Sequence, residues 1–421
     1  MVIFVTLQVS KIVLSNHKLK VFNDPIYGSV AIPSPLILQV ISHPFFQRLR
    51  RISQMGLSYL VYPGAHHTRF HHALGAMNLM QKAIDTLILK GIYLSSEEKE
   101  GLLLAILLHD IGHGPFSHAL EEKLILKHHE ILSLDFMELL NREFSGRLHM
   151  AISIFKGESK RPFLNQLVSS QLDMDRLDYL KRDSFFAGVT EGNINSERLI
   201  STLNVIDDSI VVEEKGIYSV EKFLMARRFM YWQVYLHKTS IVAEIMLGKI
   251  IQRAKELIRR KVLVEGPPNL MYLLNHQFSK DKDQTVTLSQ FAMLDDIDIM
   301  ACIKRWSSHK DVILARLCRG ILNRDLIDVR FIEEYASKVE IDKLKHKVAK
   351  EYKISIDDAD YLVYHGTLWN LAYNPDKQPI SILFRDGEII DFMQASRYAG
   401  AGAFSVKHEK NYICSPTLQL P

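Results

Sequence analysis

The pattern of apolar and polar positions predicts helices along most of the first 320 residues. Apolar side chains recur with the period of an amphipathic helix, and turn or capping residues separate the runs. Pro44 divides the first run into two helices, because proline lacks a backbone N–H and clashes with the preceding turn. Ser117 is expected to cap a further helix. The predicted helices cover residues 35–55, 70–90, 97–110, 129–142, 163–187, 196–204, 220–262 and 287–321.

Two segments alternate between apolar and polar residues and predict hairpins. Residues 204–219 carry one, with its turn expected near residues 214–216, and residues 379–392 carry the other, with its turn at Asp386–Gly387. We therefore predict a mainly α fold in three parts. These are an N-terminal extension at 1–19, a helical core at 20–260, and a smaller α+β region at 261–421 that is a candidate oligomer interface.

Composition narrows the class of protein. Hydrophobic residues make up 47% and charged residues 24% of the 421 positions, which is typical of a globular protein with a sizeable core. The net charge of +4 is too small to favour nucleic-acid wrapping, although a local phosphate pocket is compatible with it. Three widely spaced cysteines favour reduced thiols and a cytoplasmic location. No run approaches the ~18 apolar residues of a membrane span, so no membrane partner is expected.

One apolar run ends in titratable groups. Residues 102–108 are all apolar, and His109 and Asp110 follow them directly. Burying such groups is costly unless they are paired or bind a metal, and imidazole and carboxylate together suit divalent metals. Adjacent helical residues point about 100° apart, so a shared ion has to lie off the helix end. An isolated His-Asp pair is more typical of a surface, so the apolar setting is what favours a metal.

Further candidate ligands stand in two other predicted helices. His72 lies in HHTRFHHALGAM, where the alternative is a loop or core histidine. Asp175 lies in QLDMDRLDYLKRD, where the alternative is a solvated face with i,i+4 pairs such as Asp178 with Arg182. The residue types alone leave both alternatives open.

The order His, His-Asp, Asp resembles the HD-domain metallophosphohydrolases, and longer motifs make the resemblance specific. They are KVFNDPIYG, FQRLRRISQMG, YPGAHHTRFHHALGA, LLHDIGHGPFSHALE, DMDRLDYLKRD and YLHK, in order over residues 20–238. They resemble the deoxynucleoside triphosphate (dNTP) triphosphohydrolase branch, which includes the sterile-alpha-motif/HD-domain enzyme. The resemblance implies an HD-domain core that binds Fe, Mn, Zn or Ni, with Mg accompanying the nucleotide. The implied metal ligands are His72, His109, Asp110 and Asp175.

The resemblance also implies a reaction. Water activated by the ion attacks the α-phosphate, which releases a deoxynucleoside and intact triphosphate. His118 is the candidate acid for the leaving oxygen, and Glu121 orients it where relatives more often have Asp. His113 and His129 are candidates for contact with the substrate.

Other residues match the nucleotide-binding positions of the family. Asp183 is expected to accept the sugar 3′-hydroxyl, Tyr235 to pack beneath the sugar, and cations to bind the triphosphate. The implied substrate-binding residues are Gln54, Arg69, Arg176, Tyr179, Asp183, Arg227, Tyr235 and Lys238. Several relatives are oligomers activated by a second nucleotide, so a homo-dimer or tetramer is expected. The matching regulatory positions are Lys20, Gln47 and Arg50, whereas Ser42 replaces a guanine-reading acid and argues against guanine-specific activation.

Two alternative functions stand beside this hypothesis. The first keeps the metal but changes the reaction to that of a nucleotide pyrophosphohydrolase, monophosphatase or cyclic-nucleotide phosphodiesterase. Arg69, Asp183 and Tyr235 argue against it, although a fold does not fix a substrate. The second is a non-catalytic nucleotide sensor or nucleic-acid-binding scaffold, against which the intact metal positions argue.

Overall fold

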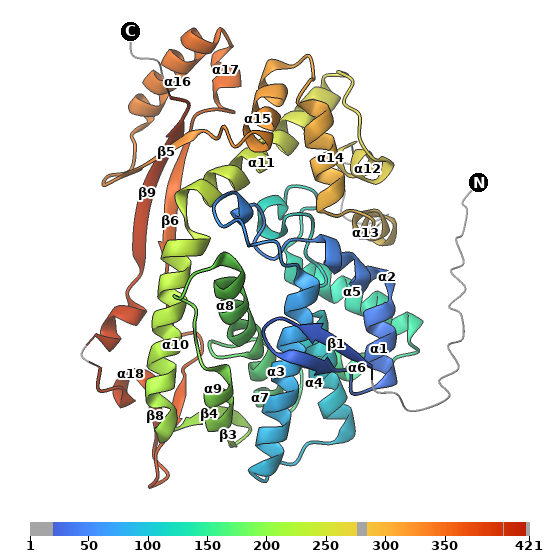
Figure 1. Ribbon diagram of the computed structural model, residues 1–421, viewed down its shortest axis with the longest axis vertical. Coiled ribbons are helices and arrows are strands. Elements are labelled where there is room, and N and C mark those ends of the chain that lie inside the picture. The colour runs from blue at the N-terminus through green and yellow to red at the C-terminus, as the bar shows by residue number, and fades with distance from the viewer. Residues whose placement is uncertain (1–19, 276–283, 399, 418–421) are drawn as a thin grey trace.

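The fold is built around a buried helix. The computed structural model describes residues 20–275, 284–398 and 400–417 (Figure 1). Helix α4 (Ser96–Leu108) begins at a capping box, in which the side chains of Ser95 and Glu98 each accept the other's backbone N–H. Residues 101–108 are all buried, because α4 packs against both α3 (Arg69–Leu89) and α6 (His149–Lys156). Residues 102–108 are apolar on every side of α4, and the C-terminal end of the helix is fixed inside the molecule.

The other elements give the mainly α structure that the sequence predicts, with α1 and α2 separated at Pro44 as expected. The remaining α-helices are α1 (Pro35–Ser42), α2 (Pro44–Gln47), α5 (His129–Glu143), α7 (Pro162–Val168), α8 (Met174–Ala187), α9 (Ser196–Thr202), α10 (Ile217–Met230), α11 (Lys238–Arg259), α12 (Pro268–Asn275), α13 (Gln284–Ala292), α14 (Asp296–Trp306), α15 (Val312–Leu322), α16 (Lys338–Tyr352), α17 (Ile356–Ala359) and α18 (Phe392–Ala395). Shorter helical turns are η1 (Arg48–Arg51), η2 (Ser58–Leu60), η3 (Ser117–Leu120), η4 (Glu214–Gly216), the π turn η5 (Tyr231–Tyr235) and η6 (Ala401–Ser405).

Three small sheets complete the described structure. Their strands are β1 (Val21–Asp24), β2 (Gly28–Ala31), β3 (Leu203–Ile206), β4 (Ser209–Glu213), β5 (Asp328–Ile332), β6 (Tyr364–Asn370), β7 (Ser381–Leu383), β8 (Ile389–Asp391) and β9 (His408–Ser415). The sheets have the orders β1-β2, β3-β4-β7-β8 and β5-β9-β6. All pairs are antiparallel except β4 with β7, in which Val211 stands opposite Ser381.

One of the two predicted hairpin turns is misplaced. The second hairpin is confirmed, since β7 and β8 are joined by a turn in which Gly387 has a φ of +92°. The first hairpin turns at Asp207 and Asp208, both with positive φ, rather than at residues 214–216. Those residues form η4 and lead into α10, because β4 has already ended at Glu213.

Three of the predicted helices are interrupted. The run 163–187 divides into α7 and α8, because Asp173 accepts the N–H of Arg176 and starts a new helix. The run 220–262 divides at η5 and His237, and the run 287–321 forms α13, α14 and α15. Ser117 is not a cap: it is the first residue of η3 and has a φ of +55°.

Strands from the predicted core and from the predicted C-terminal region pair with each other. Residues 1–19, the predicted extension, lie outside the described residues. Strand β7 from the C-terminal region pairs with β4 of the predicted core, so the two regions share one sheet at the lower end of Figure 1. Among the helices in the described ranges, none has both the length and the apolar content needed to cross a membrane.

Candidate functional site

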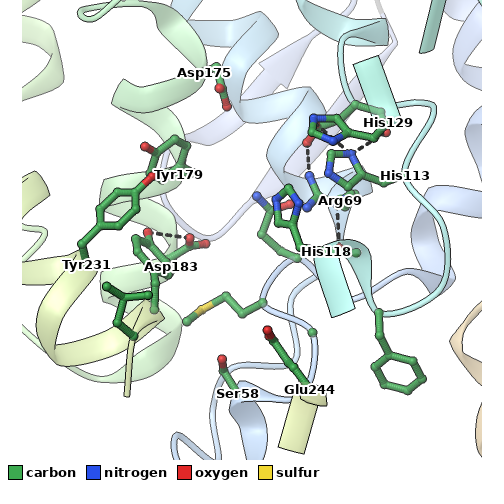
Figure 2. Close-up of a pocket in the computed structure, with 18 of the residues that line it drawn as sticks. Ser58, Arg69, His113, His118, His129, Asp175, Tyr179, Asp183, Tyr231 and Glu244 are labelled. Atoms are coloured by element: carbon green, nitrogen blue, oxygen red, sulfur yellow. Dashed lines mark hydrogen bonds and ion pairs between the residues drawn. The ribbon is translucent and has the colours of Figure 1, made fainter. Parts of the chain in front are cut away.

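One cavity gathers most of the predicted site residues. It has a volume of about 490 Å³, and it opens between α3, the loop after α4, α8 and η5 (Figure 2). A volume of this size suits a small-molecule ligand. The predicted residues that line it are Gln54, Arg69, Asp110, His113, His118, His129, Asp175, Arg176, Tyr179, Asp183 and Tyr235.

The four predicted metal ligands converge at one end of this cavity. His72 Nε2 lies 3.0 Å from Asp175 Oδ1 and 3.3 Å from His109 Nε2. Asp110 completes the group, with Oδ1 at 3.4 Å from His109 Nε2 and Oδ2 at 3.7 Å from His72 Nε2. Nitrogen and oxygen ligands that share an ion at about 2.1 Å stand roughly 3 Å apart, so the spacing and chemistry of this group fit a divalent cation.

Neighbouring groups fix the orientation of both histidines. His72 is fully buried, and its Nδ1 lies 2.7 Å from Asp178 Oδ2. The Nδ1 of His109 lies 2.6 Å from the carbonyl oxygen of Ile106, one turn earlier in α4. These contacts leave the Nε2 atoms of both rings directed at the shared point, which is how proteins commonly orient metal-binding histidines.

Asp178 and Arg182 correct one sequence interpretation. The sequence allowed them to be a solvated pair, but both side chains are fully buried, and Arg182 donates two hydrogen bonds to Asp178. Arg182 Nη1 also donates to Asp24 Oδ2 at 2.8 Å. A buried chain of charges therefore runs from β1 through Arg182 and Asp178 to His72.

The charges around the four ligands favour positive charge at the shared point. Burial would lower the pKa of His72, but the carboxylates of Asp175 and Asp178 raise it to about 10. Burial would raise the pKa of Asp175, but His109 and His72 hold it well below its ordinary value. The carboxylates thus stay ionised, and either protons on the imidazoles or a cation can balance them.

A second group of histidines stands on the wall opposite Tyr179 and Asp183 (Figure 2). The rings of His113 and His129 stack with centroids 3.9 Å apart, and that of His118 lies 4.9 Å from the His113 ring. Glu121 joins them, because Oε2 lies 2.9 Å from His118 Nδ1 and Oε1 lies 2.5 Å from His129 Nδ1. Burial would raise the pKa of Glu121, but these hydrogen bonds hold it well below its ordinary value.

Arg69 connects the cavity to the four predicted metal ligands (His72, His109, Asp110 and Asp175), which we call the metal-facing group. Its guanidinium donates to Asp110, and its Nε donates to Ser117 Oγ at 2.8 Å. Ser117 in turn donates to the Ser53 carbonyl oxygen at 2.6 Å. The left-handed backbone at Ser117 therefore places a hydroxyl that holds Arg69 in position.

Two arginines near Tyr179 carry buried N–H groups without acceptors among the described residues. Arg227 lies near Tyr179, and its Nε and Nη1 have no hydrogen-bond partner among the described residues. Arg176 pairs with Asp173 through Nη1, whereas its Nε is also unpartnered within the described ranges. Unsatisfied buried guanidinium groups are costly, and an anionic ligand would satisfy them.

Asp183 and Tyr235 form a hydrogen-bonded pair in the cavity. Tyr235 donates to Asp183 Oδ2 at 2.8 Å, and His67 Nε2 lies 2.7 Å from Asp183 Oδ1. Gln54 also lines the cavity, and its Oε1 has no partner in the described part of the chain. The aspartate is thus anchored from two sides while it faces the cavity.

The remaining predicted residues lie outside this cavity lining. Lys238 is exposed at the start of α11. The predicted regulatory residues Lys20, just before β1, and Arg50, in η1, are exposed, and Arg50 Nε donates to Gln47 Oε1 at 2.9 Å. Ser42, at the end of α1, is exposed as well. The structure therefore places Gln47 and Arg50 in contact, apart from the metal-facing group.

Sequence reasoning missed four residues that shape the site. They are His67, Ser117 as a support, Asp178 and Glu244. An aspartate four positions before an arginine has the same pattern on a solvated face and in a core, so no local signal identifies Asp178. Only its spacing in the sequence indicates Asp178, because it lies three positions after Asp175 and so on the same face of the helix.

Comparisons with known proteins agree with this arrangement. The HD domain matches residues 69–183, and the HD associated region matches residues 194–264. The uncharacterized protein YwfO of Bacillus subtilis is 32% identical over 388 residues, which are 90% of this chain and 88% of that protein.

Two further relatives carry descriptive names. The deoxynucleoside triphosphate triphosphohydrolase SAMHD1 homolog of Dictyostelium discoideum is 29% identical over 77% of this chain and 70% of its own length. A crystal structure of a phosphohydrolase from Bacteroides thetaiotaomicron is 45% identical and has a TM-score of 0.91. That alignment covers 95% of this chain and all of the other.

Proposed function

Because the chain belongs to the HD-domain family of metal-dependent phosphohydrolases, we propose that it hydrolyses dNTPs to a deoxynucleoside and triphosphate. The observation that carries this proposal is a set of buried guanidinium N–H groups that have no acceptor in the described structure, on Arg176 next to Asp175 and on Arg227 near Tyr179. A ligand with several negative charges satisfies them, whereas a neutral or singly charged ligand leaves at least one of them without an acceptor.

The metal-facing group has a defined part in this proposal. His72, His109, Asp110 and Asp175 would hold a divalent ion, and the identity of that ion is left to experiment. When bound, such an ion supplies Lewis-acid chemistry, since it lowers the pKa of water and polarises a phosphoryl oxygen. Asp178 keeps the His72 ring in the orientation that binding requires.

The histidine group supplies the proton. His118 Nδ1 is engaged by Glu121, so its Nε2 is the atom left to face the cavity. In the proposed reaction water adds to the α-phosphorus and the bond from that phosphorus to the 5′-oxygen breaks. His118 Nε2 gives a proton to the departing 5′-oxygen. Glu121 stabilises the positive charge that His118 carries before the transfer.

Asp183 and Tyr235 contribute recognition of the sugar: Asp183 binds the 3′-hydroxyl, which ribose and deoxyribose share, and Tyr235 favours deoxyribose. Asp183 is an acceptor held by His67 and Tyr235, and it accepts the 3′-hydroxyl of the sugar in this proposal. The Tyr235 ring occupies space beside the sugar, which disfavours a 2′-hydroxyl. A buried, fixed acceptor of this kind discriminates strongly against a substrate that lacks the matching donor.

A second nucleotide and self-association belong to the same proposal. Lys20 and Arg50 are exposed, Gln47 is half-buried, and all three lie outside the cavity lining, where a nucleotide bound to one subunit is accessible to another. Arg50 also lies over the Phe70 ring at 3.6 Å, so its guanidinium is held while its edge stays exposed. Light scattering with and without added dNTPs tests whether a dimer or tetramer forms.

The direct test identifies products. Metal-loaded protein is incubated with each dNTP alone and with pairs of dNTPs, and the products are separated by anion-exchange chromatography. We expect deoxynucleoside and triphosphate in equal amounts, lost in His109→Ala and retained in His346→Ala, an exposed histidine on α16. In ¹⁸O-labelled water the label should enter the triphosphate and not the deoxynucleoside. Diphosphate or single phosphate as the product contradicts the proposal and favours another HD phosphohydrolase activity.

A further inference from the structure

One acidic residue in the cavity has no part in the proposed chemistry. Glu244, on α11, lines the cavity together with Ser58, and Figure 2 shows both at the end remote from Asp175. The Glu244 carboxyl has no hydrogen-bond donor or cation partner among residues 20–275, 284–398 and 400–417. Burial raises its pKa to about 7, and no charged group opposes this effect. A carboxylate normally accepts hydrogen bonds from several donors, and the Glu244 carboxyl group lacks such donors.

A second acceptor oxygen lies close to the Glu244 carboxyl group, so a hydrogen-bond donor would be favourable there. Gly56 has a φ of +51°, and a Cβ at that position would lie 3.2 Å from both Glu244 Oε1 and the carbonyl oxygen of Phe116. Two acceptor oxygens therefore border the same small space, which only a residue without a side chain leaves free. Glycine is the residue that adopts this backbone conformation at low cost.

The same end of the cavity has apolar walls. Met55 precedes Gly56, Ile241 lies about one turn before Glu244 on α11, and Leu236, at the break after η5, also lines the cavity. Apolar walls with a few polar groups at the end suit a flat heterocyclic ring with hydrogen-bonding edges. Asp175 of the metal-facing group lies at the other end, and Asp183, which accepts a hydrogen bond from Tyr235, lies between the two ends (Figure 2).

We propose that Glu244 recognises the base of the nucleotide by accepting hydrogen bonds from an exocyclic amino group and an adjacent ring N–H. This inference rests on the proposed function, because it places phosphates at the metal end and the sugar at Asp183, which directs the base to Glu244. Guanine offers two adjacent donors, N1–H and the 2-amino group, to one carboxylate. Adenine and cytosine offer one amino group beside an acceptor nitrogen.

Thymine is the disfavoured base under this proposal. Its single ring N–H lies between two carbonyl oxygens, which repel a carboxylate. Glutamate therefore selects dGTP first, then dATP and dCTP, with dTTP last. A good bidentate contact changes selectivity by about tenfold or more, and this is the ratio expected between dGTP and dTTP. Glu244 is thus a specificity-determining residue rather than a residue that acts on the phosphate.

The test compares kcat/KM for the four dNTPs and for dITP, which lacks the 2-amino group of dGTP. Wild-type protein should hydrolyse dGTP about tenfold or more faster than dITP and dTTP. In Glu244→Gln the amide donates as well as accepts, so the preference for dGTP should be lost and dTTP should gain. Glu122→Gln, an exposed glutamate outside this cavity, should leave every ratio unchanged.

The outcomes separate this inference from the proposed function. Absence of dNTP hydrolysis by wild-type protein overturns the proposed function, and the inference falls with it. Hydrolysis with equal dGTP, dITP and dTTP rates, or with ratios that Glu244→Gln leaves unchanged, overturns the inference alone. The comparison of dGTP with dITP uses wild-type protein and does not depend on the folding of a variant. A folded Glu244→Gln variant that is inactive on every dNTP also contradicts a role in base recognition.

Discussion

Two buried arginines, Arg182 and Arg253, each bind several carboxylates, but only the Arg182 network contacts a predicted metal ligand. Arg182 donates to Asp178 through Nε and Nη2 and to Asp24 through Nη1, at 2.8–2.9 Å. All three side chains are nearly or fully buried. Asp178 Oδ2 also forms a hydrogen bond with His72 Nδ1, so this network ends at the metal-facing group.

Arg253 builds a similar network on α11. Its side chain is 5% exposed, and it contacts Asp311 at 2.6 and 3.1 Å, Glu256 at 3.0 Å and Asp358 at 2.8 Å. Asp311 precedes α15 and Asp358 lies in α17, so Arg253 ties two C-terminal helices to α11. No residue of this network lines the cavity.

The comparison shows that similar buried ion pairs have different roles, which depend on the residues that they contact next. A buried ion pair gives little net stability over an apolar contact, but removing one partner is expensive because a charge is left buried. Both networks are therefore sensitive to loss of one carboxylate. Only the Arg182 network should transmit that loss to metal binding.

The largest effect is expected for Asp178→Asn. The substitution keeps the shape of the side chain but removes the charge that Arg182 and His72 share. The free energy of unfolding should fall by about 3–5 kcal/mol. Metal affinity should fall by about 10- to 100-fold, because the His72 ring loses its support. Denaturant unfolding and metal titration measure the two effects, and an unchanged metal affinity contradicts the positioning role.

A smaller effect, confined to stability, is expected for Asp311→Asn. Asparagine remains a good N-cap for α15, so the change isolates the charge interaction with Arg253. Because Asp311 is partly exposed, the free energy of unfolding should fall by about 1–3 kcal/mol. Metal affinity should match that of the wild type. A fall in metal affinity here erases the distinction between the two networks.

The contribution of Asp311 should also depend on pH. Burial would raise the pKa of Asp311, but the hydrogen bond from Arg253 holds it below its ordinary value. The stabilisation is therefore complete above the unfolded pKa of about 3.9 and is lost as the pH falls through the lower folded value. Urea titrations should show the largest difference between wild type and Asp311→Asn at neutral pH and a shrinking one below pH ~4. A constant difference contradicts an electrostatic origin.

The smallest effect is expected at a surface pair. Lys82 contacts Glu197, and their side chains are 39% and 68% exposed. Glu197→Gln should change the free energy of unfolding by at most about 1 kcal/mol, and 0.5 M salt should reduce the effect further. The same denaturant measurement gives the baseline for both networks. A loss as large as that of Asp311→Asn would show that burial is not what separates them.

The sequence predicts local features well in this protein. The apolar run at 102–108 has no polar face, and these residues of α4 are buried on every side. Pro44 and Gly387 act through their own backbone geometry, and both mark the predicted breaks. Longer apolar runs predict a single helix where the structure has two. Residues 231–237, for example, favour a helix as strongly as the residues on either side. The interruption at η5 sets Tyr231 and Tyr235 at the cavity, and no helix-breaking residue in this segment marks it.

The candidate site divides in the same way. The motif resemblance indicates which residues to examine, and the structure brings His72, His109, Asp110 and Asp175 from three separate chain segments to one point. Supporting residues escape sequence reasoning, since His67 and Asp178 act through contacts with residues more than 100 positions away. Burial decides their roles, and burial depends on the whole fold.

The shared sheet has a consequence for synthesis of the chain. Strand β4 ends at Glu213, and its parallel neighbour β7 begins at Ser381. At about 5–20 residues per second, a ribosome needs roughly 8–34 s to add the intervening residues. Throughout that interval the nascent hairpin of β3 and β4 presents an open strand edge, the kind of surface on which chains associate wrongly. The sheet is therefore completed only after the residues of β7 and β8, which end at Asp391, have been translated.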